Sequence, residues 1–208
     1  GYLELGTLDY RLDVRDSTGT ATVATYDAPL ATLGLGDSAV VVFASGFLDP
    51  TMNSNGEAFG LWVALANGST VPLPVYTPTA RIQAIHNSAD SLAAVVDVWL
   101  NYQLLIDDFA FRTASPFIDA PAGVDFDITI QPASSMDTTN GLWRQTYQLA
   151  DGETYVLIAD GIVSGSGYNP ATPFDIYVYP MGQEMAAQPG NTDVLVFHGA
   201  TDAPTVDV

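Results

Sequence analysis

Residues 86–98 read HNSADSLAAVVDV, and residues 198–208 read HGATDAPTVDV. Both segments begin with a histidine, carry an aspartate four residues later and end in a valine-flanked aspartate. A sequence that recurs at a distance of roughly 110 residues predicts a repeated folding unit of that size, so we expect an array of modules.

Two further landmarks recur at one constant distance. Gly46 in FASGF corresponds to Gly161 in IADGI, and Phe59 in FGLWV corresponds to Phe174 in FDIYV, with the same spacing in both pairs. The two histidines lie slightly closer together than these landmarks, and the final aspartates of the two motifs lie closer still. This drift predicts small loop insertions within one shared framework.

Apolar residues alternate with polar ones in short runs that are separated by Gly, Pro, Asp and Asn clusters. This two-residue period predicts strands and turns. The expected strands are 2–5, 10–14, 21–26, 39–45, 59–65, 80–86, 95–100, 104–106, 109–113, 126–130, 144–149, 154–159, 174–179, 193–198 and 205–208. We predict an all-β protein of tandem immunoglobulin-like or transthyretin-like β-sandwich repeats.

The alignment of the repeats divides the chain into three parts. Residues 1–77 correspond to the rear part of a first sandwich, residues 78–182 to a complete central repeat, and residues 183–208 to a linker and the front strands of a further repeat. The termini are therefore expected to fall inside modules. We expect the front strands to complete the sandwich of residues 1–77 or that of a neighbouring chain, because an incomplete sandwich leaves strand edges unpaired.

Composition narrows the classes of partner. The 208 residues carry 24 acidic side chains against 5 basic ones, all arginine, for a formal charge of −19. Such a field repels nucleic acid and anionic lipid, whereas divalent cations, neutral polysaccharide and other copies of the chain remain candidate partners. No apolar run approaches the ~18 residues of a membrane span, so we expect no membrane insertion.

Two residue types are missing altogether. The sequence has no cysteine, which excludes a disulfide framework and a thiolate metal site. It also has no lysine, which excludes a lysine nucleophile. The strong acidity without lysine fits a secreted protein in salty water, and a well solvated surface is the simpler explanation.

The repeated motif resembles a known pattern, H-x-S-P-D-A-P-x-V-D-V. Residues 104–132 (LLIDDFAFRTASPFIDAPAGVDFDITIQP) and 149–161 (LADGETYVLIADG) resemble later strands and a Pro-Ala-Gly turn of the same family. It is the bacterial domain of unknown function numbered 4397, found in tandem on secreted and cell-surface proteins. The resemblance implies a fold and a secreted or cell-surface location, and no catalytic residue. The central copy departs from the pattern, since it lacks the first proline and has two extra residues.

Each copy of the motif contains a histidine, a turn aspartate and a strand aspartate. These residues are His86, Asp90 and Asp97 in one copy, and His198, Asp202 and Asp207 in the other. They could form a metal or acid–base site, but metal ligation needs three or four converging donors and each copy offers three at most. The alternative is a structural corner in which the histidine closes a strand and bonds to the turn aspartate. Recurrence in both copies favours this structural role.

Calcium is the better metal candidate, because oxygen donors are abundant. Four residues with oxygen donors lie within the loop DPTMNSNGE at 49–57: Asp49, Asn53, Asn55 and Glu57. Their spacing does not fit the twelve-residue calcium loop, and a polar hairpin loop is the alternative. No cofactor is required for folding.

Aromatic side chains are candidate ligand contacts. Trp62 and its counterpart Tyr177 alternate with the apolar positions of their strands, and Trp99 shares a strand face with Asp97. We expect these three rings to point away from the core. Outward aromatics can stack on sugar rings, or they can cover an interface between repeats.

The sequence contains no nucleophile elbow, zinc-protease helix or phosphate-binding loop. The leading prediction is a non-catalytic extracellular or cell-surface structural and adhesive protein, assembled into a fibre by strand complementation between subunits. The alternative is a carbohydrate-binding module of a secreted enzyme or adhesin. A hydrolase is a third, weaker option.

Overall fold

The computed structural model describes residues 1–204 and 206. The protein is all-β, as predicted, and its helices in the described part are two short 3-10 turns, neither long nor apolar enough to cross a membrane. The chain divides into two compact units, Gly1–Thr77 and Pro78–Val208. The division falls where the repeat alignment places a boundary.

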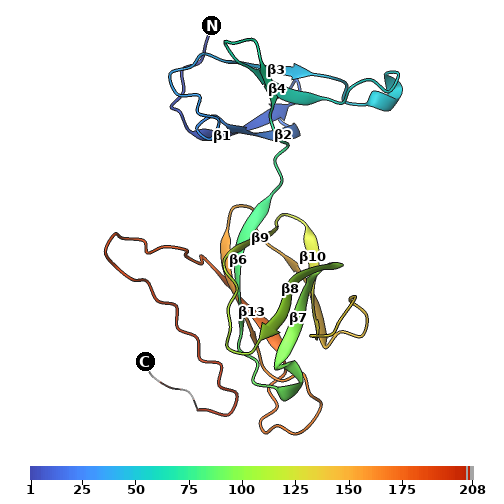
Figure 1. Ribbon diagram of the computed structural model, residues 1–208, viewed down its shortest axis with the longest axis vertical. Helices are drawn as coiled ribbons and strands as arrows, with labels where there is room; N and C mark the ends of the chain where they lie inside the picture. Colours follow the sequence, from blue (N-terminus) through green and yellow to red (C-terminus); the bar gives the residue numbers. More distant parts are fainter. Residues whose placement is uncertain (205, 207–208) are drawn as a thin grey trace. The chain divides into compact units, whose positions relative to one another are not determined.

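The second unit is a sandwich of two four-stranded sheets. Its strands are β6 (Thr79–His86), β7 (Val95–Leu100), β8 (Gln103–Ala110), β9 (Ile118–Pro121), β10 (Asp125–Pro132), β11 (Trp143–Gln148), β12 (Thr154–Asp160) and β13 (Asp175–Pro180), with the turn η2 (Ser91–Ala93) before β7. The strand orders are β11-β10-β7-β8 and β13-β12-β6-β9. Figure 1 shows the neighbouring strands β7 and β8 of the first of these sheets. β6 and β12 run parallel, whereas their other neighbours are antiparallel.

The core of the second unit follows from the alternating pattern. Along β10 the side chains of Phe126, Ile128 and Ile130 are buried and join one hydrophobic cluster, to which both sheets contribute. Phe174 packs edge-on against Trp143 with ring centroids 5.3 Å apart. Full burial of one such side chain stabilises the fold by about 1.5–3 kcal/mol.

The first unit contains fewer strands. They are β1 (Asp9–Arg15), β2 (Thr22–Pro29), β3 (Val41–Ser45), β4 (Gly60–Ala64) and β5 (Thr70–Pro72), with the turn η1 (Pro50–Met52) between β3 and β4. β1 and β2 form a hairpin, and the other three form a sheet in the order β3-β4-β5. Its core is small and is centred on Tyr26, Leu61 and Val63.

The structure corrects several predicted strands. Residues 2–5 and 193–198 form no strand, and residues 104–106 and 109–113 belong partly to one strand, β8, which has a shift in register. Of the predicted strand 205–208, only Val206 lies among the described residues. Residues 2–5 correspond to β9, which pairs with β6 alone. The described first unit has no counterpart of β6, so these residues have no edge to join.

Candidate assembly interface

The same loop follows β3 in the first unit and β12 in the second. Each loop starts at a glycine with positive φ, Gly46 at 90° and Gly161 at 91°, and closes through a parallel bridge. A side chain at these positions would overlap the backbone of Ala58 or Pro173, respectively. Only glycine fits both constraints. The glycine landmark found in the sequence is therefore one structural device present twice.

β3 and β12 are equivalent strands with different surroundings. Val41 pairs with Ala64 in the first unit, and their counterparts Val156 and Tyr179 pair in the second. β12 lies between β13 and β6, whereas β3 has β4 on one side and, among the described residues, no strand on the other. Val41 is 51% exposed, and Val156 is 7% exposed. β3 thus presents an open edge with unpaired backbone groups.

Residues 193–198 have the sequence pattern of β6 without its pairing. When the two histidines of the repeated motif are aligned, Val194 corresponds to Ile82. Ile82 is 3% exposed in the core, but Val194 itself is 75% exposed. Phe197 is the best packed residue of the segment, since its ring lies 5.5 Å from that of Tyr177 and 6.1 Å from that of Tyr179. We call residues 193–198 the unpaired segment.

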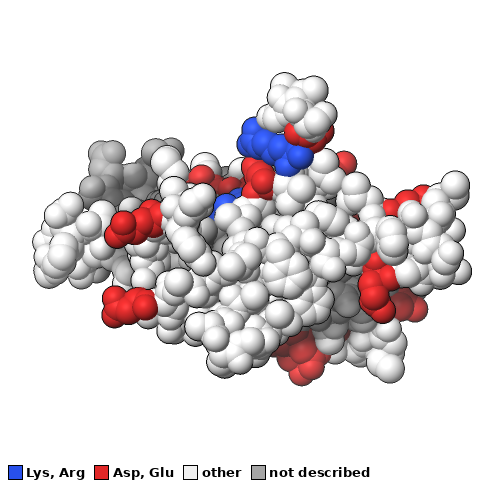
Figure 2. Space-filling model, turned by 90° about the horizontal axis from the view of Figure 1, so that it is seen from above, with Lys and Arg blue, Asp and Glu red and all other residues white. Residues whose placement is uncertain are grey.

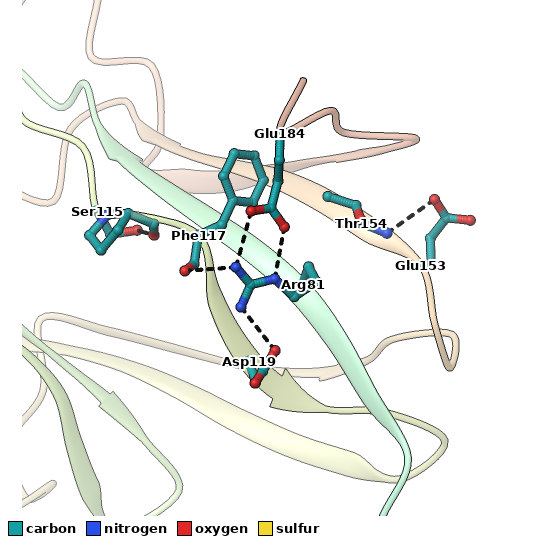
Figure 3. A network of polar contacts seen from close by, with 8 residues as sticks. Arg81, Ser115, Phe117, Asp119, Glu153, Thr154 and Glu184 are labelled. Carbon is teal, nitrogen blue, oxygen red and sulfur yellow. Dashed lines mark hydrogen bonds and ion pairs between the residues drawn. The ribbon is translucent and has the colours of Figure 1, made fainter. Parts of the chain in front are cut away.

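An ion-pair cluster fixes the start of the C-terminal tail, which we define as residues 183–204 (Figure 3). The Arg81 guanidinium donates to both carboxylate oxygens of Glu184, at 2.8 and 3.1 Å, and to Asp119 at 3.0 Å. Arg81 holds the pKa of the Glu184 carboxyl below its ordinary value. The pairs are exposed and contribute little stability, but they hold the tail beside β6 and β9.

His86 has a structural role that differs in detail from the prediction. Its buried ring packs against Phe109 and Phe111, and its Nε2 atom is 2.7 Å from the carbonyl oxygen of Ala93. The expected bond to Asp90 is therefore wrong. Burial lowers the pKa of His86, so the ring is neutral at pH 7.

Asp90 lies between β6 and β7 and is hydrogen-bonded to the loop that follows β12. Its carboxylate accepts hydrogen bonds from the backbone of Val163 and Ser164 at 2.9 and 2.7 Å, and from the hydroxyl of Tyr168 at 3.0 Å. The amide of Leu92 and the hydroxyl of Ser164 also donate to it. Burial opposes ionisation, but the hydrogen bonds outweigh it and hold the pKa of Asp90 below its ordinary value.

Asp97 lies in a different network and does not share a corner with His86. Its carboxylate accepts from the amide of Asp108 at 3.1 Å and from the hydroxyl of Ser135 at 2.5 Å. Asp107 and Asp108 bring two further carboxylates within 4.8 Å, and both are exposed. The sequence motif thus supplies separate structural contacts, not one converging site.

The second copy of the motif keeps one of these contacts. The Nε2 atom of His198 is 3.1 Å from the carbonyl oxygen of Pro204, as His86 is bonded to Ala93. Asp202 is exposed, and Asp207 lies outside the described residues. The histidine-to-carbonyl bond is therefore local and does not need the rest of a module.

The three candidate ligand-facing aromatics differ in exposure. Trp99 is only 8% exposed, and its indole N–H donates to Ser135 at 2.9 Å, so its predicted availability to a ligand is wrong. It does face away from the core, but the loop containing Ser135 covers it. Trp62 is half-buried, and Tyr177 is partly covered by Phe197. The sugar-binding alternative retains only these two rings.

The predicted calcium loop closes through its own hydrogen bonds. The carboxylate of Asp49 caps η1 by accepting from the amide and hydroxyl of Thr51 at 3.0 and 2.6 Å. Asn53 donates to the carbonyl oxygen of Asp49, and the amide of Asn55 donates to that of Pro50. Glu57 contributes its backbone carbonyl to the bridge with Phe47. Calcium binding at this loop stays a prediction.

Acidic side chains outnumber basic ones by 24 to 5. Figure 2 shows acidic side chains spread over the displayed face and basic side chains in only a small part of it. Arginines form local partners, as in the pairs Arg15–Asp13 and Arg144–Asp127.

Several residues that join the segment after β6 to the loop after β12 were not predicted from the sequence. Ser88 donates to the carbonyl oxygen of Gly161 at 2.6 Å, and Ser164 and Tyr168 lie far along the chain from Asp90. The serine of the H-x-S motif and the repeated glycine were visible signals. Their pairing required the parallel alignment of β6 and β12, which periodicity does not reveal.

One family matches the chain. The domain of unknown function DUF4397 matches residues 80–208, from the second residue of β6 to the end of the chain. No curated protein matches the chain.

Proposed function

We propose, from the premise that the chain belongs to the DUF4397 family, that it is a non-catalytic structural and adhesive protein of the bacterial cell surface or secreted matrix. Its copies join into a fibre by strand complementation. The open edge of β3 carries this proposal. β12, the equivalent strand, has a neighbour on that edge.

The polar residues support a structural role. The ring of His86 and the carboxylates of Asp90 and Asp97 are buried and hydrogen-bonded to backbone or hydroxyl groups. Each of these contacts stabilises a turn or a strand junction. These contacts engage the three side chains in structure, and the carboxylates of Asp107 and Asp108 that lie near Asp97 are exposed.

An edge strand with unpaired backbone groups favours addition of another strand. The exposed side chains of Val41, Val42 and Phe43 add apolar area to this edge. A strand beside β3 would pair with these backbone groups and would also cover the apolar side chains. Because the edge of one copy would pair with a different segment of the next, the joint is head-to-tail, and we propose that it repeats into an open fibre.

Light scattering over a dilution series tests the proposal, with electron microscopy of the concentrated sample. The expected result is a mass that rises with concentration, and filaments at the upper end. Val42→Lys is the edge variant, because Val42 corresponds to the buried Leu157 and a lysine there opposes strand addition. A chain that stays monomeric at every concentration would contradict the proposal.

A further inference from the structure

The internal repeat identifies which strand fits the open edge of β3, and in which register. β12 pairs with β6 in parallel, with Val156 opposite Gln83 and Ile158 opposite Ile85. The spacing of the two glycine landmarks relates β12 to β3, and the spacing of the two histidines relates β6 to the unpaired segment. The same pairing then places Val41 opposite Leu195.

We propose that residues 193–198 of one copy add to β3 of a second copy as a parallel strand in this register. The inference rests on the proposed function and names its partner. In the second unit, β6 turns Ile82 and Ala84 toward the core. Their counterparts Val194 and Val196 would enter the sandwich of the second copy, and Leu195 would face outward.

The present exposure of these residues agrees with this assignment. Val194 and Val196 are apolar, exposed and unpaired in the described structure, although β6 buries the equivalent positions wholly or in part. The inner side of β3 lacks cover as well, since Val42 is 44% exposed and its counterpart Leu157 is 6% exposed. Burying both sets removes apolar surface from water on each side of the joint.

Asp202 provides a second contact in the same alignment. In the second unit, its counterpart Asp90 accepts from the amides of Val163 and Ser164. The equivalent amides in the first unit belong to Leu48 and Asp49, and neither donates a hydrogen bond in the described structure. Asp49 replaces Ser164, so only the two amide bonds carry over.

The length of the connections favours a second copy over the same chain. Residues 65–78, which include β5, join β4 to β6, and residues 181–192 join the equivalent β13 to the unpaired segment. The two connections are similar in length, and the first leads from one unit into the next. The connection after β13 is expected to lead onward in the same way, into the first unit of another copy, when Phe197 leaves its contacts with Tyr177 and Tyr179.

Arg81 has no basic counterpart in the segment, because Asp193 occupies the equivalent position. The joint therefore depends on backbone hydrogen bonds, apolar contacts and the Asp202 carboxylate, without an ion pair equivalent to that of Arg81. Since each copy carries a formal charge of −19, added salt should promote assembly by screening repulsion.

Cysteine pairs test the register directly, because the chain has no cysteine of its own. A Val41→Cys chain is mixed with a Leu195→Cys chain under mild oxidation. We expect a disulfide-linked pair of chains, because directly paired strand residues lie within disulfide reach. The control is Val41→Cys with Phe197→Cys, on the same face but two residues out of register, and we expect at least a tenfold lower yield.

Equal yields from both mixtures would overturn the register. A chain carrying both Val41→Cys and Leu195→Cys that links only within itself would overturn the choice of a second copy. Assembly of the unmodified chain without the Val41–Leu195 link would leave the proposed function standing and refute this inference alone. Absence of any assembly would refute both.

Alternation along the segment provides an independent readout. Val194→Asp places a charge inside the sandwich of the second copy, whereas Leu195→Asp places it outside. Both residues are exposed now, so neither change is expected to unfold the second unit. We expect Val194→Asp to weaken assembly at least tenfold and Leu195→Asp to change it less than threefold. Equal effects would show that the segment does not add as a strand.

Discussion

The two units build the same hairpin but bury it to different depths. β1 pairs with β2 in an antiparallel hairpin as β10 does with β11, and DYRLDV at 9–14 matches DFDITI at 125–130, so that Leu12 corresponds to Ile128. Ile128 is buried, whereas Leu12 is only partly buried. The core cluster has 17 buried members in the second unit and 5 in the first. The local sequence pattern is thus enough to pair the two strands of a hairpin. Burial of their apolar side chains also requires the strands of a facing sheet.

The largest expected effect tests whether the two glycine loops are equivalent. Gly161→Ala should destabilise the second unit by about 4 kcal/mol, because a left-handed backbone costs an alanine about 1–2 kcal/mol and the overlap with Pro173 adds about 1–3 kcal/mol. Urea unfolding measures the loss. Gly165→Ala is the control, since open space surrounds it. Gly46→Ala should destabilise the first unit similarly, and sensitivity at only one loop would break the equivalence.

The next largest effect comes from the difference in burial between Ile128 in the second unit and Leu12 in the first. Ile128→Ala should cost the second unit about 3 kcal/mol, whereas Leu12→Ala should cost the first about 1 kcal/mol, because a partly buried side chain leaves a smaller cavity. Amide hydrogen exchange, measured separately on peptides from each unit, reports both losses. Similar losses would mean that the core of the first unit is already complete.

A smaller effect concerns the carboxylate that the first unit lacks. Asp90→Asn should cost about 2 kcal/mol at pH 7, since an amide cannot satisfy all the donors around it. The pKa of Asp90 is lowered in the folded state, so its stabilisation is present above the unfolded value, about 4, and is lost as the pH falls through the folded pKa. The difference in Tm between the unmodified protein and the Asp90→Asn variant should therefore shrink below about pH 4. A constant difference would assign the loss to packing instead of charge.

The smallest effect concerns the loop of the first unit. Asp49→Ala removes the cap of η1 and should lower the Tm slightly, because the carboxylate is exposed. Thermal unfolding in calcium and in chelator should give the same small decrease. If calcium raises the Tm of the unmodified protein and not that of the variant, the loop is a calcium site.

Much of the fold was predictable from alternation alone. The strands around Phe126, Tyr155 and Ile176 were expected within a few residues, because they are short, rich in β-branched and aromatic residues and bounded by turn residues. β8 was predicted as two strands, since Asp107 and Asp108 interrupt its apolar pattern. Asp108 adopts a positive φ of 49° beside the register shift, and the strand continues through it.

The unpaired segment shows where sequence prediction ends. Residues 193–198 have the alternation of β6, but a strand forms only when another backbone supplies hydrogen-bond partners. Within their own unit the equivalent place beside β12 is already filled by β6. The candidate site shows the same limit, because the histidine and aspartates were visible while their partners came from distant loops.

The parallel pairing of β6 with β12 also bears on the order in which a module folds. Arg81 and Thr154 sit opposite each other, although five other strands of the unit lie between β6 and β12 in the sequence. Closing so long a loop carries a high entropic cost before any contact rewards it, and domains rich in such contacts fold slowly. During synthesis the first strand of the module therefore stays without this neighbour until most of the module has been made.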